Sequence, residues 1–142
     1  MTGGRWNPPG TEALYLARPI STCRAEFLRM AHGQGRGPES FLPRRVHIIA
    51  VTNLAVVDLR SDEALLSVGL DRNAIGGNWG PCQAVGDAAD TLGLGGLLVP
   101  SATGSGEVLA VFVRHAHHGE LSVVRSMTTR DPSWSSLDDS DQ

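Results

Sequence analysis

The order of apolar and polar positions divides the chain into short strands and helices. Runs with the length and Val, Ile and Leu content of strands occur at residues 13–17, 45–51, 54–58, 96–99, 107–113 and 120–125. Helices are predicted from Pro19 to Gly33, from Ser61 to Gly69 and from Pro81 to about Leu92. Ser21 or Thr22 is expected to cap the first helix, and residues 13–17 are expected to be a buried strand.

The remaining segments are predicted to be irregular. Residues 3–11, 33–43 and 71–80 are rich in Gly, Pro or Asn, which favour loops. From Thr128 onward Ser, Asp and Pro dominate, so residues 128–142 are predicted to be an acidic disordered tail behind a domain at 1–127. The chain of 142 residues has the length of one domain, and its strands and helices do not alternate strictly. An α+β single domain is therefore expected.

The charge distribution argues against a nucleic-acid binder. The formal net charge is −3, but four Asp residues lie in 131–142, and residues 1–130 carry a net charge of +1. A nearly neutral body offers no basic face for a phosphate backbone. All 12 cationic side chains are Arg. The absence of Lys excludes a P-loop, a Schiff-base lysine and a Ser–Lys nucleophile pair.

The sequence predicts a cytoplasmic protein that does not span a membrane. Its N-terminus lacks the apolar segment of a signal peptide, and the longest apolar stretch, 46–57, is interrupted by polar residues and is too short for a span. Cys23 and Cys82 are separated by 59 positions and lie in predicted helices, so we expect them to be free, buried thiols of a reducing compartment.

Several motifs of known chemistry are incomplete. Gly33 and Gly35 lack the third glycine and the preceding strand of a dinucleotide-binding loop. Ser105 lacks the glycine pattern of a nucleophile elbow. Three histidines, His115, His117 and His118, cluster after a strand, but no further ligands follow at metal-site spacing. A solvated hairpin tip is the preferred interpretation, and no metal is expected.

The first helix places a carboxylate among apolar residues. Cys23, Phe27 and Met30 have the spacing of one helix face, and Glu26 lies within that stripe. Burying a charge costs several kcal/mol unless the charge is paired or functional. One interpretation is a structural ion pair of Glu26 with Arg5 or Arg45. The other is a functional carboxylate.

Three more residues have the chemistry of a binding site. Arg5 follows two glycines, where backbone can approach a ligand closely, and its guanidinium suits phosphate groups. Arg5 has the alternatives of packing on Trp6 or pairing with Glu12. Tyr15 offers a ring with a polar tip, or is a core aromatic. Ser101 follows a strand, where it lines a pocket or only shapes a turn.

These residues resemble a known family, the RES domain. The resemblance rests on GGRWNPPGTEALYLA at 3–17, on CRAEFLR at 23–29 and on VPSA at 99–102. The family is named for an Arg, a Glu and a Ser, which match Arg5, Glu26 and Ser101. WGPCQAVGDAA at 79–89, followed by GLLVPSA, is similar to the mycobacterial branch whose toxin is an NAD phosphorylase. The resemblance covers about residues 3–126.

The resemblance implies a fold and an activity. It implies an ADP-ribosyltransferase-like mixed sheet with flanking helices. It also implies a toxin of a type II toxin–antitoxin pair that is neutralised by an Xre-type helix-turn-helix antitoxin. Such toxins split the nicotinamide–ribose bond of NAD, with inorganic phosphate or water as acceptor and without a metal. A relative that transfers ADP-ribose to a protein supplies an alternative.

The resemblance also assigns roles. Glu26 would stabilise the positive charge that develops on the ribose, and Arg5 would hold the diphosphate as the second catalytic group. Tyr15 would stack on nicotinamide, and Ser101 would bind the ribose or orient Glu26. The pocket would be lined by Asn7, Trp79 and Gln83.

The N-terminus departs from the family pattern. Family members carry some tens of residues before GGRWN, including a first strand with a basic residue, whereas here Met1 lies two residues before Gly3. The N-terminal strand of the family is therefore expected to be missing. Either the start is misassigned, or the chain is a truncated, inactive remnant that only binds the antitoxin.

Overall fold

The computed structural model describes residues 3–135 and residue 137. Its strands are β1 (Ala13–Arg18), β2 (Arg44–Val51), β3 (Val56–Asp58), β4 (Gly96–Pro100), β5 (Glu107–Phe112) and β6 (Leu121–Thr129). Its helices are α1 (Ile20–Gly33), α2 (Asp62–Ser67), α3 (Arg72–Gly76) and α4 (Trp79–Thr91), with short 3-10 turns at Pro38–Phe41 and Val113–His115. None of these described helices is both long and apolar enough to cross a bilayer.

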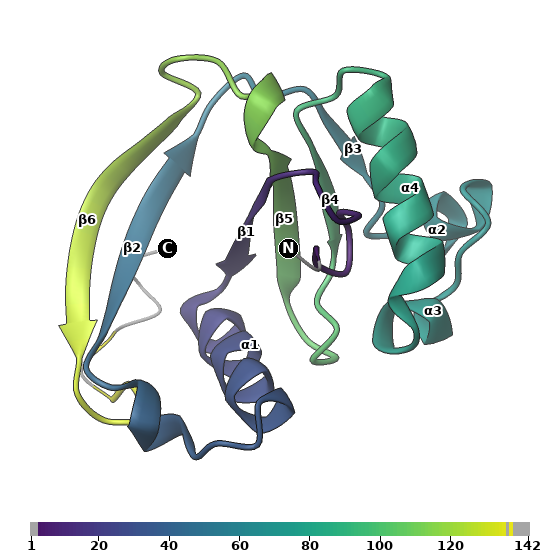
Figure 1. The fold of residues 1–142 in the computed structure, drawn as a ribbon. Coiled ribbons are helices and arrows are strands. Elements are labelled where there is room, and N and C mark those ends of the chain that lie inside the picture. Colours follow the sequence, from purple (N-terminus) through teal and green to yellow (C-terminus); the bar gives the residue numbers. More distant parts are fainter. Residues whose placement is uncertain (1–2, 136, 138–142) are drawn as a thin grey trace.

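The strands form two separate sheets (Figure 1). Four strands follow the order β1-β5-β4-β3, in which β3 and β4 are parallel and the other neighbours are antiparallel. β2 and β6 form an antiparallel pair that lies to one side of the larger sheet. The predicted α+β class, with a mixed sheet and flanking helices, is therefore confirmed.

The main core lies between the larger sheet and α4. Alternate residues of β4 and β5 face it, because side chains of a strand point to opposite faces. The buried residues of this core include Trp6, Cys82, Ala89, Leu97, Val99, Val108, Ala110 and Phe112. The N-terminal segment that carries Trp6 is thus part of the core and lies on the same face of the sheet as α4.

A second core joins α1 to the β2–β6 pair. Ile20, Phe27 and Val46 are buried there together with Trp134, whose ring centroid lies 5.5 Å from that of Phe27. Cys23 and Met30 pack against this cluster, so the apolar stripe predicted on the first helix is confirmed. Cys23 is half-buried rather than buried, and both cysteines are free as predicted.

Two local predictions about β1 and α1 are wrong. β1 is an edge strand, so it is not buried, and Leu14 and Tyr15 are 39% and 40% exposed. Neither Ser21 nor Thr22 caps α1, because Pro19 occupies the cap position and Thr22 Oγ1 instead donates to the carbonyl of Ser105 at 3.2 Å.

The predicted loop at 71–80 contains helical structure. Asp71 caps α3 by accepting a hydrogen bond from the Ala74 N–H at 2.9 Å. α4 begins at Trp79 rather than at Pro81, because Asn78 Oδ1 accepts from the Gly80 N–H at 2.8 Å. Short side-chain caps therefore start both helices within a segment whose composition resembles that of a loop.

Structure continues beyond the predicted end of the domain. β6 runs to Thr129, which is fully buried, and Trp134 is 4% exposed. Arg24 Nε of α1 donates to the carbonyl of Pro132 at 2.9 Å and holds this segment in place. The prediction of disorder is wrong for residues 128–135. Its acidic end, with Asp138, Asp139 and Asp141, lies outside the described residues.

Trp134→Ala is expected to lower the free energy of unfolding by about 3 kcal/mol, because it removes a large buried ring from the second core. Trp134→Phe is the matched variant. It keeps a ring against Phe27 and removes an indole N–H that is buried without a partner among the described residues. We expect it to cost less than about 1 kcal/mol. Urea titration measures both, and equal stabilities of the two variants would contradict the packing.

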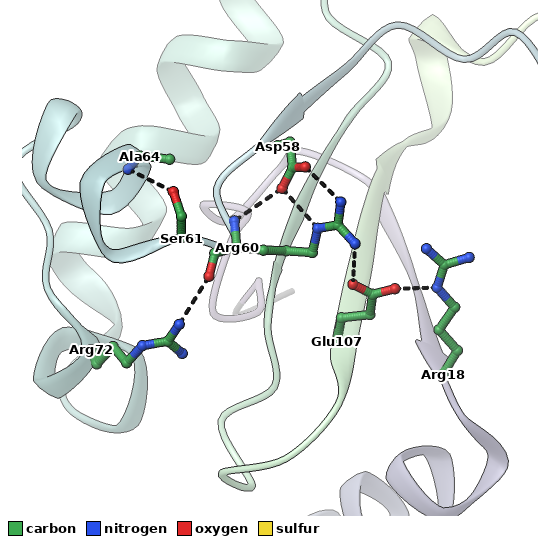
Figure 2. Close-up of polar contacts among 7 residues, drawn as sticks. All are labelled: Arg18, Asp58, Arg60, Ser61, Ala64, Arg72 and Glu107. Carbon is green, nitrogen blue, oxygen red and sulfur yellow. Dashed lines mark hydrogen bonds and ion pairs between the residues drawn. The ribbon is translucent and has the colours of Figure 1, made fainter.

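A row of ion pairs crosses the ends of three strands on the larger sheet. Figure 2 shows Arg60 between Asp58 and Glu107, and Arg18 on the other side of Glu107. Arg60 Nη2 lies 2.7 Å from Asp58 Oδ2, and Arg60 Nη1 lies 2.9 Å from Glu107 Oε2. Hydrogen bonds from Arg60 lower the pKa of Asp58 to about 2. Each guanidinium of this row is therefore balanced by a carboxylate.

Candidate active site

Glu26 and Ser101 meet although 75 positions separate them in the sequence. Ser101 follows directly after β4, is 5% exposed, and its Oγ donates a hydrogen bond to Glu26 Oε1 at 2.6 Å. Glu26 is half-buried on α1. The inward-facing carboxylate predicted from the helix pattern is thus directed at the carboxyl end of a core strand.

Thr103 fixes the direction of the Ser101 hydroxyl. Its backbone N–H donates to Ser101 Oγ at 3.1 Å, and the two side-chain oxygens lie 2.6 Å apart. Because Ser101 has one hydroxyl proton and gives it to Glu26, the Thr103 hydroxyl is the donor in the second contact. Ser101 therefore accepts twice from Thr103 and donates once to Glu26.

The loop that carries Arg5 is held tightly on β1 and α4. The Gly4 N–H donates to the Asn7 carbonyl at 3.0 Å and closes a narrow turn. A Cβ on Gly4 would lie 2.6 Å from the Tyr15 hydroxyl oxygen, and a Cβ on Gly86 of α4 would lie 1.7 Å from the Trp6 carbonyl oxygen. Both positions require glycine, because a Cβ would collide with the Tyr15 side chain at Gly4 and with the Trp6 backbone at Gly86.

Tyr15, Asn7 and Gln83 hold this loop by hydrogen bonds. The Tyr15 hydroxyl accepts from the Trp6 N–H at 3.0 Å and donates to Asn7 Oδ1, and burial raises the pKa of Tyr15. Gln83 Nε2 donates to the Gly4 carbonyl at 2.8 Å. The polar groups of Asn7 and Gln83 are thus directed to the protein's own backbone and side chains. The Tyr15 ring remains 40% exposed, so it is not a core aromatic.

Arg5 lies between this loop and the start of α4. Its Nη1 donates to the Gly77 carbonyl at 2.9 Å, and its guanidinium carbon lies 5.9 Å from the ring centre of Trp79, which is 43% exposed. Neither of the alternative partners predicted for Arg5, Trp6 and Glu12, is used.

Several neighbouring groups act on the pKa of Arg5, and Glu26 is one of them. Burial lowers the pKa of Arg5 and the positive charge of Arg29 lowers it further, whereas Cys82 and, to a smaller extent, the negative charge of Glu26 raise it. These three side chains therefore share one electrostatic neighbourhood. Among the described residues Glu26 forms no ion pair with any arginine, so the pairs predicted with Arg5 or Arg45 are not formed.

The described part of the chain does not support a metal site or a cysteine nucleophile. No three His, Cys, Asp or Glu side chains there are placed to hold a metal ion. His117 and His118 are exposed in a turn as expected, whereas His115 Nε2 contacts the Asp90 carbonyl at 2.8 Å. Burial raises the pKa of the Cys82 thiol and that of Cys23, which argues against a thiolate nucleophile.

Two hollows open elsewhere on the molecule. One of 510 Å³ is lined by the paired Arg18, Arg60 and Glu107, and one of 520 Å³ has an almost wholly apolar lining between α4 and the sheet. Neither is lined by Arg5, Glu26 or Ser101. We assign the candidate site from its side-chain chemistry, because the first hollow is charge-compensated and the second offers no catalytic group.

Residues 1–135 match the family model of the RES domain. The chain belongs to the RES domain family. This RES domain is 41% identical over 129 residues to the NAD(+) phosphorylase MbcT of Mycobacterium bovis and to MbcT of Mycobacterium tuberculosis. The aligned region covers 88% of this chain and 69% of MbcT. The crystal structure of the Mycobacterium tuberculosis MbcT–MbcA toxin–antitoxin complex matches with a TM-score of 0.80 and 38% identity, over 92% of this chain and 73% of that one.

This RES domain places two further side chains, Thr103 and Arg29, near Ser101, and neither is among the site residues predicted from the sequence. Thr103 lies two residues after Ser101, the spacing of a turn closed by a serine hydroxyl. Arg29 lies three residues after Glu26, the spacing at which side chains share a helix face. Both spacings are visible in the sequence, but they carry meaning only once Glu26 and Ser101 are known to meet.

Proposed function

We propose that this RES-domain protein breaks the nicotinamide–ribose bond of NAD and transfers the ADP-ribose unit to inorganic phosphate. The main support is the 2.6 Å hydrogen bond from Ser101 to Glu26. Glu26 is a carboxylate that forms no ion pair in the described structure, and its charge acts on the nearby Arg5. Both features occur in a chain 41% identical to an NAD(+) phosphorylase. The proposed action is that of a toxin.

Cleavage of the nicotinamide–ribose bond requires mainly electrostatic stabilisation from the protein. Nicotinamide leaves from a cationic ring nitrogen, so no acid is required to protonate it. Positive charge develops on the ribose as the bond stretches, as it does in glycoside cleavage. A fixed carboxylate stabilises that charge more in the transition state than in the ground state. Glu26 supplies this carboxylate, and the hydrogen bond from Ser101 holds it in one orientation.

The remaining site residues bind and orient the substrate. Arg5 binds the diphosphate of NAD, since a guanidinium matches phosphate oxygens and is already held by Gly77. The exposed face of Tyr15 stacks on nicotinamide, and Trp79 lines the site beneath Arg5. Asn7 and Gln83 keep the Arg5 loop in place through their hydrogen bonds, so their contribution is indirect.

The partner and location follow from the same proposal. An enzyme that consumes NAD must be neutralised in its own cell, and a relative was crystallised as a toxin–antitoxin complex. We propose a cognate antitoxin of the Xre helix-turn-helix type for this chain. NAD and phosphate are both available in the cytoplasm, which is the proposed location. No metal is required by the chemistry outlined above.

The test is to incubate the purified protein with NAD and follow free nicotinamide, with phosphate or with sulfate at equal ionic strength. We expect release that depends on phosphate, and ADP-ribose phosphorylated at its anomeric carbon as the product. Release of equal rate in sulfate would make water the acceptor, and label from NAD on a protein would indicate transfer to protein. Absence of release from a folded sample under both conditions would refute the proposal.

A further inference from the structure

We infer that Arg29 forms a second phosphoryl-binding group at the site, and that its ligand is the inorganic phosphate that accepts ADP-ribose. The inference rests on the proposed function and assigns one side chain to its second substrate. Arg29 lies on α1 one turn after Glu26, so the two side chains project from the same region of the helix.

The guanidinium of Arg29 is anchored at the reacting end of the site. Its Nη1 donates to the Ala102 carbonyl at 3.1 Å, and Ala102 directly follows the Ser101 that binds Glu26. Arg29 is exposed, and its other N–H groups have no partner among the described residues. One contact therefore fixes its position while the remaining donors face solvent beside Ser101.

The charges beside Glu26 are not balanced by the protein itself. Arg18, Arg60, Arg72 and Arg114 each form an ion pair with a carboxylate. Within the described structure, neither Arg5 nor Arg29 forms an ion pair, and they are close enough for the charge of Arg29 to lower the pKa of Arg5. Arg5 and Arg29 carry two positive charges and Glu26 carries one negative charge, so one positive charge remains, which a bound anion relieves.

Two ligands with phosphoryl groups take part in the proposed reaction, the diphosphate of NAD and free phosphate. The carbonyl that each arginine contacts indicates which of the two ligands it binds. Arg5 is held by Gly77 before α4, on the side of Trp79, where it suits the diphosphate of NAD. Arg29 is held by the residue that follows Ser101, and Ser101 binds Glu26, the carboxylate that the proposed function assigns to the breaking bond. The acceptor must approach the anomeric carbon there, so free phosphate is the ligand that fits Arg29.

The transfer step balances with these components alone. A lone pair of a phosphate oxygen forms a bond to the anomeric carbon, while the carbon–nitrogen bond breaks and its electron pair returns to the nicotinamide ring. Nicotinamide leaves as a neutral molecule. Dianionic hydrogen phosphate becomes a phosphate ester, and its remaining proton exchanges with solvent. Arg29 donates hydrogen bonds to phosphate throughout and transfers no proton.

The experiment compares Arg29→Gln and Arg29→Lys with the wild type in steady-state kinetics, varying phosphate and NAD separately. We expect Arg29→Gln to raise KM for phosphate at least about 10-fold, since a charged donor is removed, with KM for NAD within about 3-fold of the wild-type value. Arg29→Lys is expected to restore part of the loss. Arg130→Gln, which removes a charge from an exposed residue after β6, is the control and leaves both constants unchanged.

Phosphate binding without NAD separates this inference from the proposed function. A ³¹P NMR titration with inorganic phosphate is expected to show binding to the wild type that Arg29→Gln weakens at least about 10-fold. An enzyme inactive on NAD would refute the function, and the titration would still test Arg29. An unchanged phosphate affinity in folded Arg29→Gln overturns the inference. So does a rise in KM for NAD alone, which would place the diphosphate on Arg29 instead.

Discussion

Glu26→Gln is expected to lower kcat for NAD cleavage by about 100- to 1,000-fold, the usual effect of removing one electrostatic group from a transition state. The amide keeps the size of the side chain and can still accept the hydrogen bond of Ser101. It loses the negative charge that stabilises the ribose cation. KM for NAD is expected to change little, because the interaction develops only as the bond breaks. The measurement is release of nicotinamide at saturating NAD and phosphate.

The matched control is Glu63→Gln, which removes the same charge from an exposed position in the first turn of α2. Its kcat is expected to equal that of the wild type, and both variants are expected to unfold at the wild-type urea concentration within error. A Glu26→Gln enzyme with kcat within 3-fold of the wild type would show that Glu26 does not stabilise the transition state. A large loss of stability in Glu26→Gln would assign the residue a structural role.

Gly86→Ala is expected to reduce both stability and activity, because the added methyl group collides with backbone. Its Cβ would lie 1.7 Å from the carbonyl oxygen of Trp6, and no side-chain rotation relieves that contact. The loop must move away from α4, which withdraws the buried Trp6 from the core and displaces Arg5. We expect a loss of about 1–3 kcal/mol in unfolding free energy and at least about a 10-fold fall in kcat/KM for NAD.

Gly33→Ala is the control for this substitution. Gly33 is the last residue of α1, and nothing lies within 4 Å of the position its Cβ would take. We expect Gly33→Ala to leave the stability unchanged or slightly raised, because Ala is the better helix former, and to leave the activity unchanged. Wild-type stability and activity in Gly86→Ala would mean that the N-terminal loop is not held against α4.

The segment around Trp134 illustrates what the local sequence does not encode. Its Ser, Asp and Pro content is that of a disordered tail, and no periodic pattern marks it as an element. One tryptophan is nevertheless buried, because α1 and β2 leave space beside Phe27 that its ring fills. The same limit applies to α3, whose five residues are too few to show a helical period and whose start depends on the cap by Asp71.

The sequence by itself determined the class of fold, most of the longer elements, the inward face of the first helix and, by resemblance, the family with its Arg5, Glu26 and Ser101. These features are local: they depend on side-chain periodicity and on residue types within short segments. Only the tertiary structure decided which partner satisfies Glu26. The sequence left open an ion pair of Glu26 with Arg5 or Arg45 and, by resemblance, a contact with Ser101. The fold brings Ser101 to Glu26 from 75 positions away, with Arg29 and Thr103 nearby. Such contacts are set by how strands and helices pack, and packing depends on the whole chain rather than on any one segment.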